Sequence, residues 1–260
     1  MTTAIPADDP LALAAIAAVQ GDDVAAVERM RADRPELATA RIEDEHAARG
    51  PLSFTLLHKA VDAPGHRPAG PAVIAALLAA GADVDARFAG PHRETPLHWA
   101  ASNDDIPALD ALMDAGADLE ADGAVIAGGT PLDDAVAFGQ WRAARRLAER
   151  GASTALWHAA GLGLMDRVTG HLAGDRLPVA HPWGPGSTEP PGDVTVAFWI
   201  ACSAGQREAA ELPASHGADI DWVSPWDGLT PLDVAENGGA TGLAVWLRAQ
   251  GARSAADLAG

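Results

Sequence analysis

Three segments of this chain have nearly the same sequence. They are Thr95-Pro-Leu-His-Trp-Ala-Ala101, Thr130-Pro-Leu-Asp-Asp-Ala-Val136 and Thr230-Pro-Leu-Asp-Val-Ala-Glu236. Each is followed, 21 residues after its threonine, by a Gly-Ala pair that begins at Gly116, Gly151 or Gly251. A sequence that recurs at a fixed spacing predicts a row of small units, each of which buries its apolar face against its neighbours.

The recurrence of nearly the same residues in these segments has a physical reason in helix formation. A threonine hydroxyl accepts a hydrogen bond from a free N–H of the first helical turn, and proline fits the first helical position because its missing N–H has no partner there. Glycine takes the left-handed conformation that ends a helix. Each repeated segment therefore predicts the start of one helix, and the Gly-Ala pair predicts the end of a second.

In sequence and spacing, these segments resemble the ankyrin-repeat family, whose unit of about 33 residues consists of a finger-like turn, an inner helix and an outer helix. The resemblance implies an all-α fold, a solenoid of helix-turn-helix units with short finger turns. It also implies that His58 and His98, at the fourth position of the motif, form hydrogen bonds between repeats. Asp133 and Asp233 replace this histidine in two repeats and keep an acceptor there.

The resemblance divides the chain into seven units of a single domain, residues 1–260. A degenerate N-terminal cap covers residues 8–50, and a C-terminal cap repeat covers residues 230–260. The repeats between them are predicted at about residues 51–94, 95–129, 130–153, 154–176 and 193–229. Two stretches rich in proline and glycine cannot be helical: the segment from Ala63 to Pro71 inside the second unit, and an irregular loop at residues 177–192.

Composition narrows the classes of partner. The formal net charge is −18, whereas nucleic-acid binding needs a basic stripe and anionic membranes attract basic segments. We therefore expect a partner that carries a basic patch and neither a nucleic acid nor a membrane. The single cysteine, Cys202, lies in an apolar run and suits a reducing compartment, so we expect a cytoplasmic protein. The abundance of Ala, Arg, Asp and Gly with few Lys is typical of GC-rich bacteria.

Proteins of this family bind partners with their finger tips and the exposed ends of their inner helices, along one concave face. Carried over by position, the predicted contact residues of this chain are Phe88, His92, Arg93, Asn103, Ile126, Phe138, Trp222, Trp226 and Asp227. Large aromatic side chains exposed on a finger are typical of an interface. The leading hypothesis is a protein-interaction scaffold. Trp222 and Trp226 also have a simpler explanation, which is that they pack on each other.

A second hypothesis is a small-molecule binder or an enzyme. The chain has eight tryptophans and no tyrosine, and Trp99, Trp157, Trp183 and Trp199 would line an aromatic pocket under the loop at residues 177–192. Aligned inner helices place Asp134 and His158 in neighbouring repeats, where a carboxylate beside a histidine is suited to acid–base chemistry. The simpler explanation is that both side chains have local structural partners.

The remaining motifs predict no cofactor and no metal site. His171, His181 and Asp193 are near each other in sequence, but their spacing matches no set of metal ligands. Whether the chain is an enzyme stays open at this point, with the balance against it. A third hypothesis is an immunity partner that neutralises a basic toxin.

Overall fold

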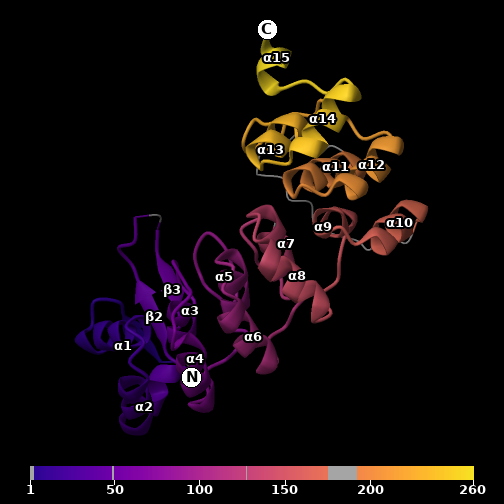
Figure 1. Ribbon diagram of the computed structural model, residues 1–260. Coiled ribbons are helices and arrows are strands. Elements are labelled where there is room, and N and C mark those ends of the chain that lie inside the picture. The colour runs from indigo at the N-terminus through magenta and orange to yellow at the C-terminus, as the bar shows by residue number, and fades with distance from the viewer. Residues whose placement is uncertain (1–2, 49, 127, 175–191) are drawn as a thin grey trace. The chain divides into compact units, whose positions relative to one another are not determined.

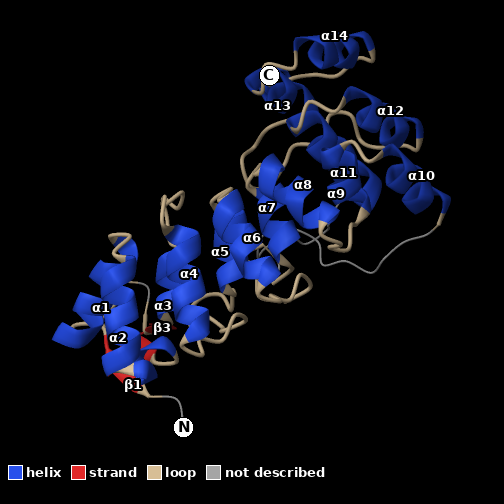
Figure 2. Cartoon of the chain, turned by 60° about the horizontal axis from the view of Figure 1, so that its bottom comes forward, coloured by secondary structure: helices blue, strands red, loops and turns tan. Residues whose placement is uncertain are grey.

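The computed structural model describes residues 3–48, 50–126, 128–174 and 192–260. The chain divides into two compact units, Met1–Ala135 and Val136–Gly260. Both are built mainly from short helices (Figures 1 and 2). The expected all-α class is therefore confirmed. The predicted repeat boundaries stay predictions.

In the first unit, the helices form two layers. Helices α1, α3 and α5 contact one another in order, and α2, α4 and α6 do the same (Figure 1). The bounds are α1 Pro10–Gln20, α2 Val24–Asp33, η1 Pro35–Ala38, α3 Leu56–Ala60, α4 Gly70–Ala79, α5 Pro96–Ser102 and α6 Ile106–Asp114. Helix α7, Pro131–Ala137, crosses from the first unit into the second. The predicted break at residues 63–71 lies mostly in the loop before α4.

A small sheet at the start of the first unit was not expected from the sequence. Strand β2 (Arg41–Asp44) pairs in parallel with β1 (Ala4–Pro6) and antiparallel with β3 (Leu52–Phe54). The strands are coloured red in Figure 2. Ser53 continues the pairing to Ala89, with both backbone hydrogen bonds at 2.8 Å. Strands of three or four residues carry too little alternation for a sequence pattern to reveal them.

The second unit has the same kind of layering. Helix α11 packs against α9, α12 and α13, and α13 packs against α14. The bounds are α8 Trp141–Glu149, α9 Leu156–Leu162, α10 Met165–Ala173, α11 Asp193–Ser203, α12 Arg207–Ser215, α13 Pro231–Asn237, α14 Thr241–Ala249 and α15 Ala255–Ala259. The predicted loop at residues 177–192 lies outside the described residues except for Gly192, and so does His181.

The motif histidines hold helix starts and neighbouring repeats together. His58 Nδ1 accepts the Thr55 N–H at 3.3 Å, and His58 Nε2 contacts the carbonyl oxygen of Glu94 at 3.2 Å. His98 repeats this arrangement with Thr95 at 3.1 Å and with Gly129 at 3.3 Å. Because Nδ1 accepts a backbone N–H, the proton of each neutral ring is on Nε2, which donates to the carbonyl.

The aspartate that replaces the histidine in the last repeat also links two segments. Asp233 Oδ2 accepts the Thr230 N–H at 2.9 Å and the Ala255 N–H at 2.9 Å. The polarity of the link is reversed, because a carboxylate accepts where a histidine Nε2–H donates. An acceptor is thus retained at this position, as the sequence predicted.

Gly123 allows the two turns of the first unit to approach each other closely. Its φ is +115°, and a Cβ placed on it would lie 2.4 Å from the carbonyl oxygen of Arg93. We expect Gly123→Ala to destabilise the first unit by roughly 1–3 kcal/mol, because it adds backbone strain to this clash. Thermal unfolding checks this, with Gly116→Ala (φ +91°, no atom within 4 Å) as the control for strain alone. Equal losses in both variants would contradict the close approach.

Candidate binding surface

Two fingers project from the first unit. We define the first finger as residues 86–94 and the second finger as residues 121–126 with 128 and 129. The Arg93 N–H donates to the Gly123 carbonyl at 3.2 Å, which joins one finger to the other. Arg93 is exposed, and His92 and Ile126 are half-buried. These three predicted contact residues therefore lie on accessible parts of the fingers.

Phe88 does not lie on the accessible surface of the first finger. Its side chain is 8% exposed and packs against the rings of His58 and Trp99, at centroid distances of 6.3 and 5.5 Å. The expectation that Phe88 is exposed is wrong, because the finger folds its aromatic side chain back over the inner helices. Glu94, at the end of the same finger, is also buried, at 6% exposure.

The two predicted residues at inner-helix ends differ in their surroundings. Asn103, after α5, is half-buried and donates from its side-chain amide to the Val61 carbonyl at 2.9 Å. That bond ties two neighbouring repeats together. Phe138, after α7, is 46% exposed. A large aromatic side chain exposed in this way is available to a partner.

The last finger, residues 219–229, carries a cluster of tryptophans in the second unit. Trp226 lies edge-on to Trp199 at a centroid distance of 5.0 Å and to Trp222 at 5.4 Å. The Trp199 indole N–H donates to the Leu229 carbonyl at 3.0 Å, which fixes the inner ring. Trp226 is still 42% exposed, as is its neighbour Val223 at 42%. Both the interface hypothesis and the packing explanation therefore describe part of this cluster.

Asp227 shapes the turn of the last finger. Its carboxylate accepts hydrogen bonds from the Ser224 hydroxyl and, at 3.0 Å, from the Leu229 N–H. The side chain is also exposed. Asp227 thus holds the turn that presents Trp226 and adds a negative charge beside it.

The tryptophans of the alternative pocket are mostly buried in the described structure. Trp99 is half-buried in the first unit against His58, whereas Trp157 and Trp199 are 4% and 5% exposed in the second. Trp183 lies outside the described residues. The centroid of the Trp157 ring lies 3.8 Å from that of His158. These contacts place the three described rings in packing roles, and a shared pocket stays a prediction.

The suggested acid–base pair falls in two different units, Asp134 in the first and His158 in the second, and each is described within its own unit. Asp134 is 0% exposed and His158 is 2% exposed. The Ala155 N–H donates to His158 Nδ1 at 3.0 Å, as in the other motif histidines. Both side chains are therefore almost completely shielded from solvent in the described structure. Their pairing for catalysis stays a prediction.

Asp134 has a titratable neighbour that sequence reasoning did not identify. This neighbour is Glu94, which is 6% exposed. Burial, followed by the negative charge of Glu94, raises the pKa of Asp134 to about 8. Burial also raises the pKa of Glu94. Glu94 is 40 residues from Asp134 in the sequence, and no motif relates the two.

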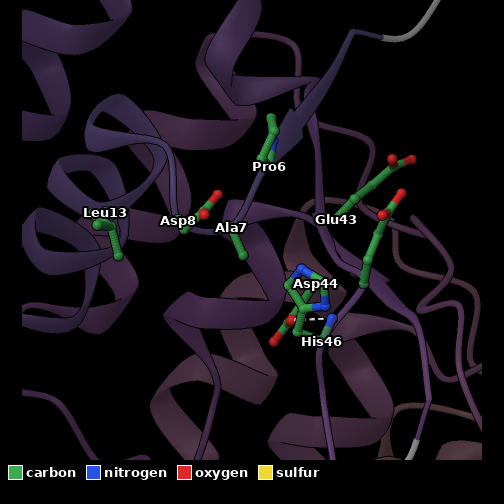
Figure 3. Close-up of a pocket in the computed structure, with 8 residues that line it drawn as sticks. Pro6, Ala7, Asp8, Leu13, Glu43, Asp44 and His46 are labelled. Carbon is green, nitrogen blue, oxygen red and sulfur yellow. Dashed lines mark hydrogen bonds between the residues drawn. The ribbon is translucent and has the colours of Figure 1, made fainter.

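Acidic residues make up half of the lining of a hollow in the first unit (Figure 3). It lies beside α1, β1 and the end of β2, and the Asp44 carboxylate accepts the His46 N–H at 3.0 Å. Its lining consists of Pro6, Ala7, Asp8, Leu13, Glu43, Asp44, Glu45 and His46. The acidic run from Glu43 to Glu45 was the sequence signal for this hollow. The sequence prediction assigned this region only to the degenerate N-terminal cap.

Within the described residues, no group of three or more His, Cys, Asp or Glu side chains is placed to hold a metal ion. No helix in the described ranges is both long and apolar enough to span a membrane.

Comparison with known proteins gives one family match. Residues 57–156 match the family model for ankyrin repeats, in three copies. The matched range runs from α3 to the start of α9 and includes both fingers of the first unit. No curated protein matches the chain.

Proposed function

Because this chain is an ankyrin-repeat protein, we propose that it is a protein-interaction scaffold that holds a partner with a basic patch. Ankyrin repeats generally mediate contacts between proteins. The proposed contact residues are the exposed and half-buried members of the predicted set, which are His92, Arg93, Asn103, Ile126, Phe138, Trp222, Trp226 and Asp227. We further propose seven repeats and a bacterial cytoplasmic setting.

The observation that carries the proposal is the exposure of Trp226. A tryptophan that is 42% exposed keeps a large apolar area in water, which is unfavourable unless a partner covers it. Trp199 and Trp222 support it from behind and hold its orientation. Rigid aromatic anchors of this kind supply most of the binding free energy in many interfaces.

The basic character of the partner is argued from charge. The chain carries a formal net charge of −18, and the hollow in the first unit adds the exposed carboxylates of Asp8, Glu43 and Glu45. Opposite charges speed encounter and select the partner. Salt is therefore expected to weaken the association, because it screens exposed charges.

Replacement of the exposed tryptophan tests the proposal. We expect Trp226→Ala to lower the affinity for the captured partner at least tenfold, because truncation of an interface anchor costs roughly 2 kcal/mol or more. The measurement is quantitative affinity purification from the source organism, followed by titration of the recovered partner at low and high salt. The melting temperature of the second unit is recorded in parallel, so that lost binding is separated from lost folding.

Val245→Ala is the matched control, because Val245 is an apolar side chain that is 62% exposed on α14, the second helix of the last repeat. It should leave binding unchanged. Equal recovery of the partner by Trp226→Ala and by the wild type would show that the last finger is not part of the interface. Binding that is insensitive to salt would contradict the basic partner.

A further inference from the structure

The last finger combines aromatic rings with carboxylates. Its sequence contains Asp219, Asp221, Asp227, Trp222 and Trp226, and no lysine or arginine. A cation is attracted both by the negative charge of a carboxylate and by the electron-rich face of an indole ring. The composition of the finger therefore favours a cationic group of a partner over a purely apolar one.

Two of the three carboxylates keep their charge toward a partner. Asp221 is already compensated, because Arg253 donates to its Oδ2 from Nε at 2.8 Å and from Nη2 at 2.7 Å. Asp219 and Asp227 are exposed and form no ion pair within the residues that the structure describes. The finger thus presents two negative charges without a cation of its own.

The tryptophan cluster holds one indole ring at the surface in a fixed orientation. The Trp226 ring is inclined at 87° to Trp199 and at 64° to Trp222, so neither of these rings stacks flat on it. Trp199 is 5% exposed and is fixed by its hydrogen bond to Leu229. Trp226, supported by both rings, is 42% exposed. A ring held in this way loses little conformational freedom when a ligand stacks on it.

We propose that the last finger binds an arginine side chain from a basic segment of the partner, with the guanidinium group on the Trp226 ring and paired with Asp227. This inference rests on the proposed function, because it names the group that the exposed tryptophan recognises. A guanidinium is planar and weakly hydrated, so it stacks on an aromatic ring better than an ammonium group does. Tryptophan is the aromatic side chain that attracts cations most strongly.

Asp227 is suited to the second part of this contact. It follows Trp226 directly in the sequence, and its Oδ1 accepts the hydrogen bonds from Ser224 and Leu229 that hold the turn. Its Oδ2 takes part in neither bond and can accept from a guanidinium N–H. A charged hydrogen bond of this kind is stronger than one between neutral groups.

Titration of the full chain with a short capped peptide of alternating arginine and glycine tests the inference without the partner. Binding is followed by NMR of the tryptophan indole N–H groups. The signals of Trp222 and Trp226 should move, whereas that of Trp246, half-buried on α14, should stay in place. A second peptide carries citrulline, an uncharged analogue of nearly the same shape, in place of arginine. It should bind at least about fivefold more weakly, because it lacks the attraction between cation and ring.

Two variants separate the finger from the general negative charge of the chain. Trp226→Leu keeps the net charge of −18 and an apolar side chain, and it should weaken binding of the arginine peptide roughly three- to tenfold. Asp227→Asn removes one charge but keeps the side-chain oxygen that holds the turn, and the expected loss is roughly two- to fivefold. Glu208→Gln, an exposed carboxylate on α12 of the same unit, removes the same charge and should leave binding unchanged.

The comparison of peptides on the wild type needs no variant, so it remains decisive if Trp226→Leu fails to fold. Equal binding of the arginine and citrulline peptides would overturn the proposal, as would equal binding of the arginine peptide to the wild type and a folded Trp226→Leu. A lysine peptide that binds as tightly as the arginine peptide would overturn the assignment to a guanidinium. If Trp226→Ala loses the captured partner while the arginine peptide does not bind, the arginine contact fails and the scaffold function stands.

Discussion

Acidification from pH 6.5 to 4 is expected to destabilise the first unit strongly, because His58 and His98 are buried in their neutral form. Burial is the main cause that lowers the pKa of each ring, to about 4 in both cases. Each ring accepts a backbone N–H on Nδ1. Protonation of that nitrogen would replace an acceptor by a donor and break the helix cap.

The sign and size follow from the difference between folded and unfolded states. Between the ordinary pKa of 6.5 and the folded value of about 4, the unfolded chain binds protons that the folded unit cannot. Stability therefore falls as the pH drops through this range and levels off below it. The loss is roughly 3 kcal/mol for each histidine. Two such losses are comparable to the total stability of a small domain, about 5–15 kcal/mol.

Thermal unfolding of the full chain between pH 4 and 7 checks this, with hydrogen exchange to assign the transition to the first unit. His98→Gln should reduce the acid-induced loss by about half, since a glutamine amide does not titrate in this range. His92→Gln on the first finger, where the side chain is half-buried, is the matched control and should keep the full loss. A first unit whose stability is constant from pH 6.5 to 4 would contradict the assignment.

Removal of the Phe198 ring is expected to cost the second unit about 3–5 kcal/mol. Phe198 lies on α11 and is 0% exposed. Helix α11 packs against α9, α12 and α13, so the ring fills the centre of this unit. Phe198→Ala therefore loses buried apolar area and leaves a cavity that short packed helices close only in part.

Phe138→Ala is the matched control, because Phe138 belongs to the same unit and is 46% exposed. The same chemical change there should cost less than about 1 kcal/mol, as surface substitutions usually do. Denaturant unfolding monitored by hydrogen exchange in residues 193–260 compares the two variants. A loss in Phe198→Ala no larger than in Phe138→Ala would show that α11 is not the centre of the unit.

The sequence by itself determined the helical class of the fold and the positions at which individual helices begin or end. Thr95, Thr230 and the left-handed Gly251 act through the backbone within a few residues of their own position. Local hydrogen bonds and allowed φ angles fix such features wherever the motif occurs. The family resemblance also implied the hydrogen-bonding role of His58 and His98. The three-stranded sheet did not, because its strands are short and pair across distant segments.

Only the tertiary structure decided which finger residues face outward. Phe88 and Glu94 belong to the same finger as His92 and Arg93, but the first two are buried and the others remain accessible. The burial of Asp134 was equally invisible in the sequence, because it arises only when neighbouring repeats stack. The burial and the pKa of an ionisable group depend on the residues that pack around it. A repeat motif specifies the backbone of each repeat. The side chains of the neighbouring repeat determine how deeply its residues are buried.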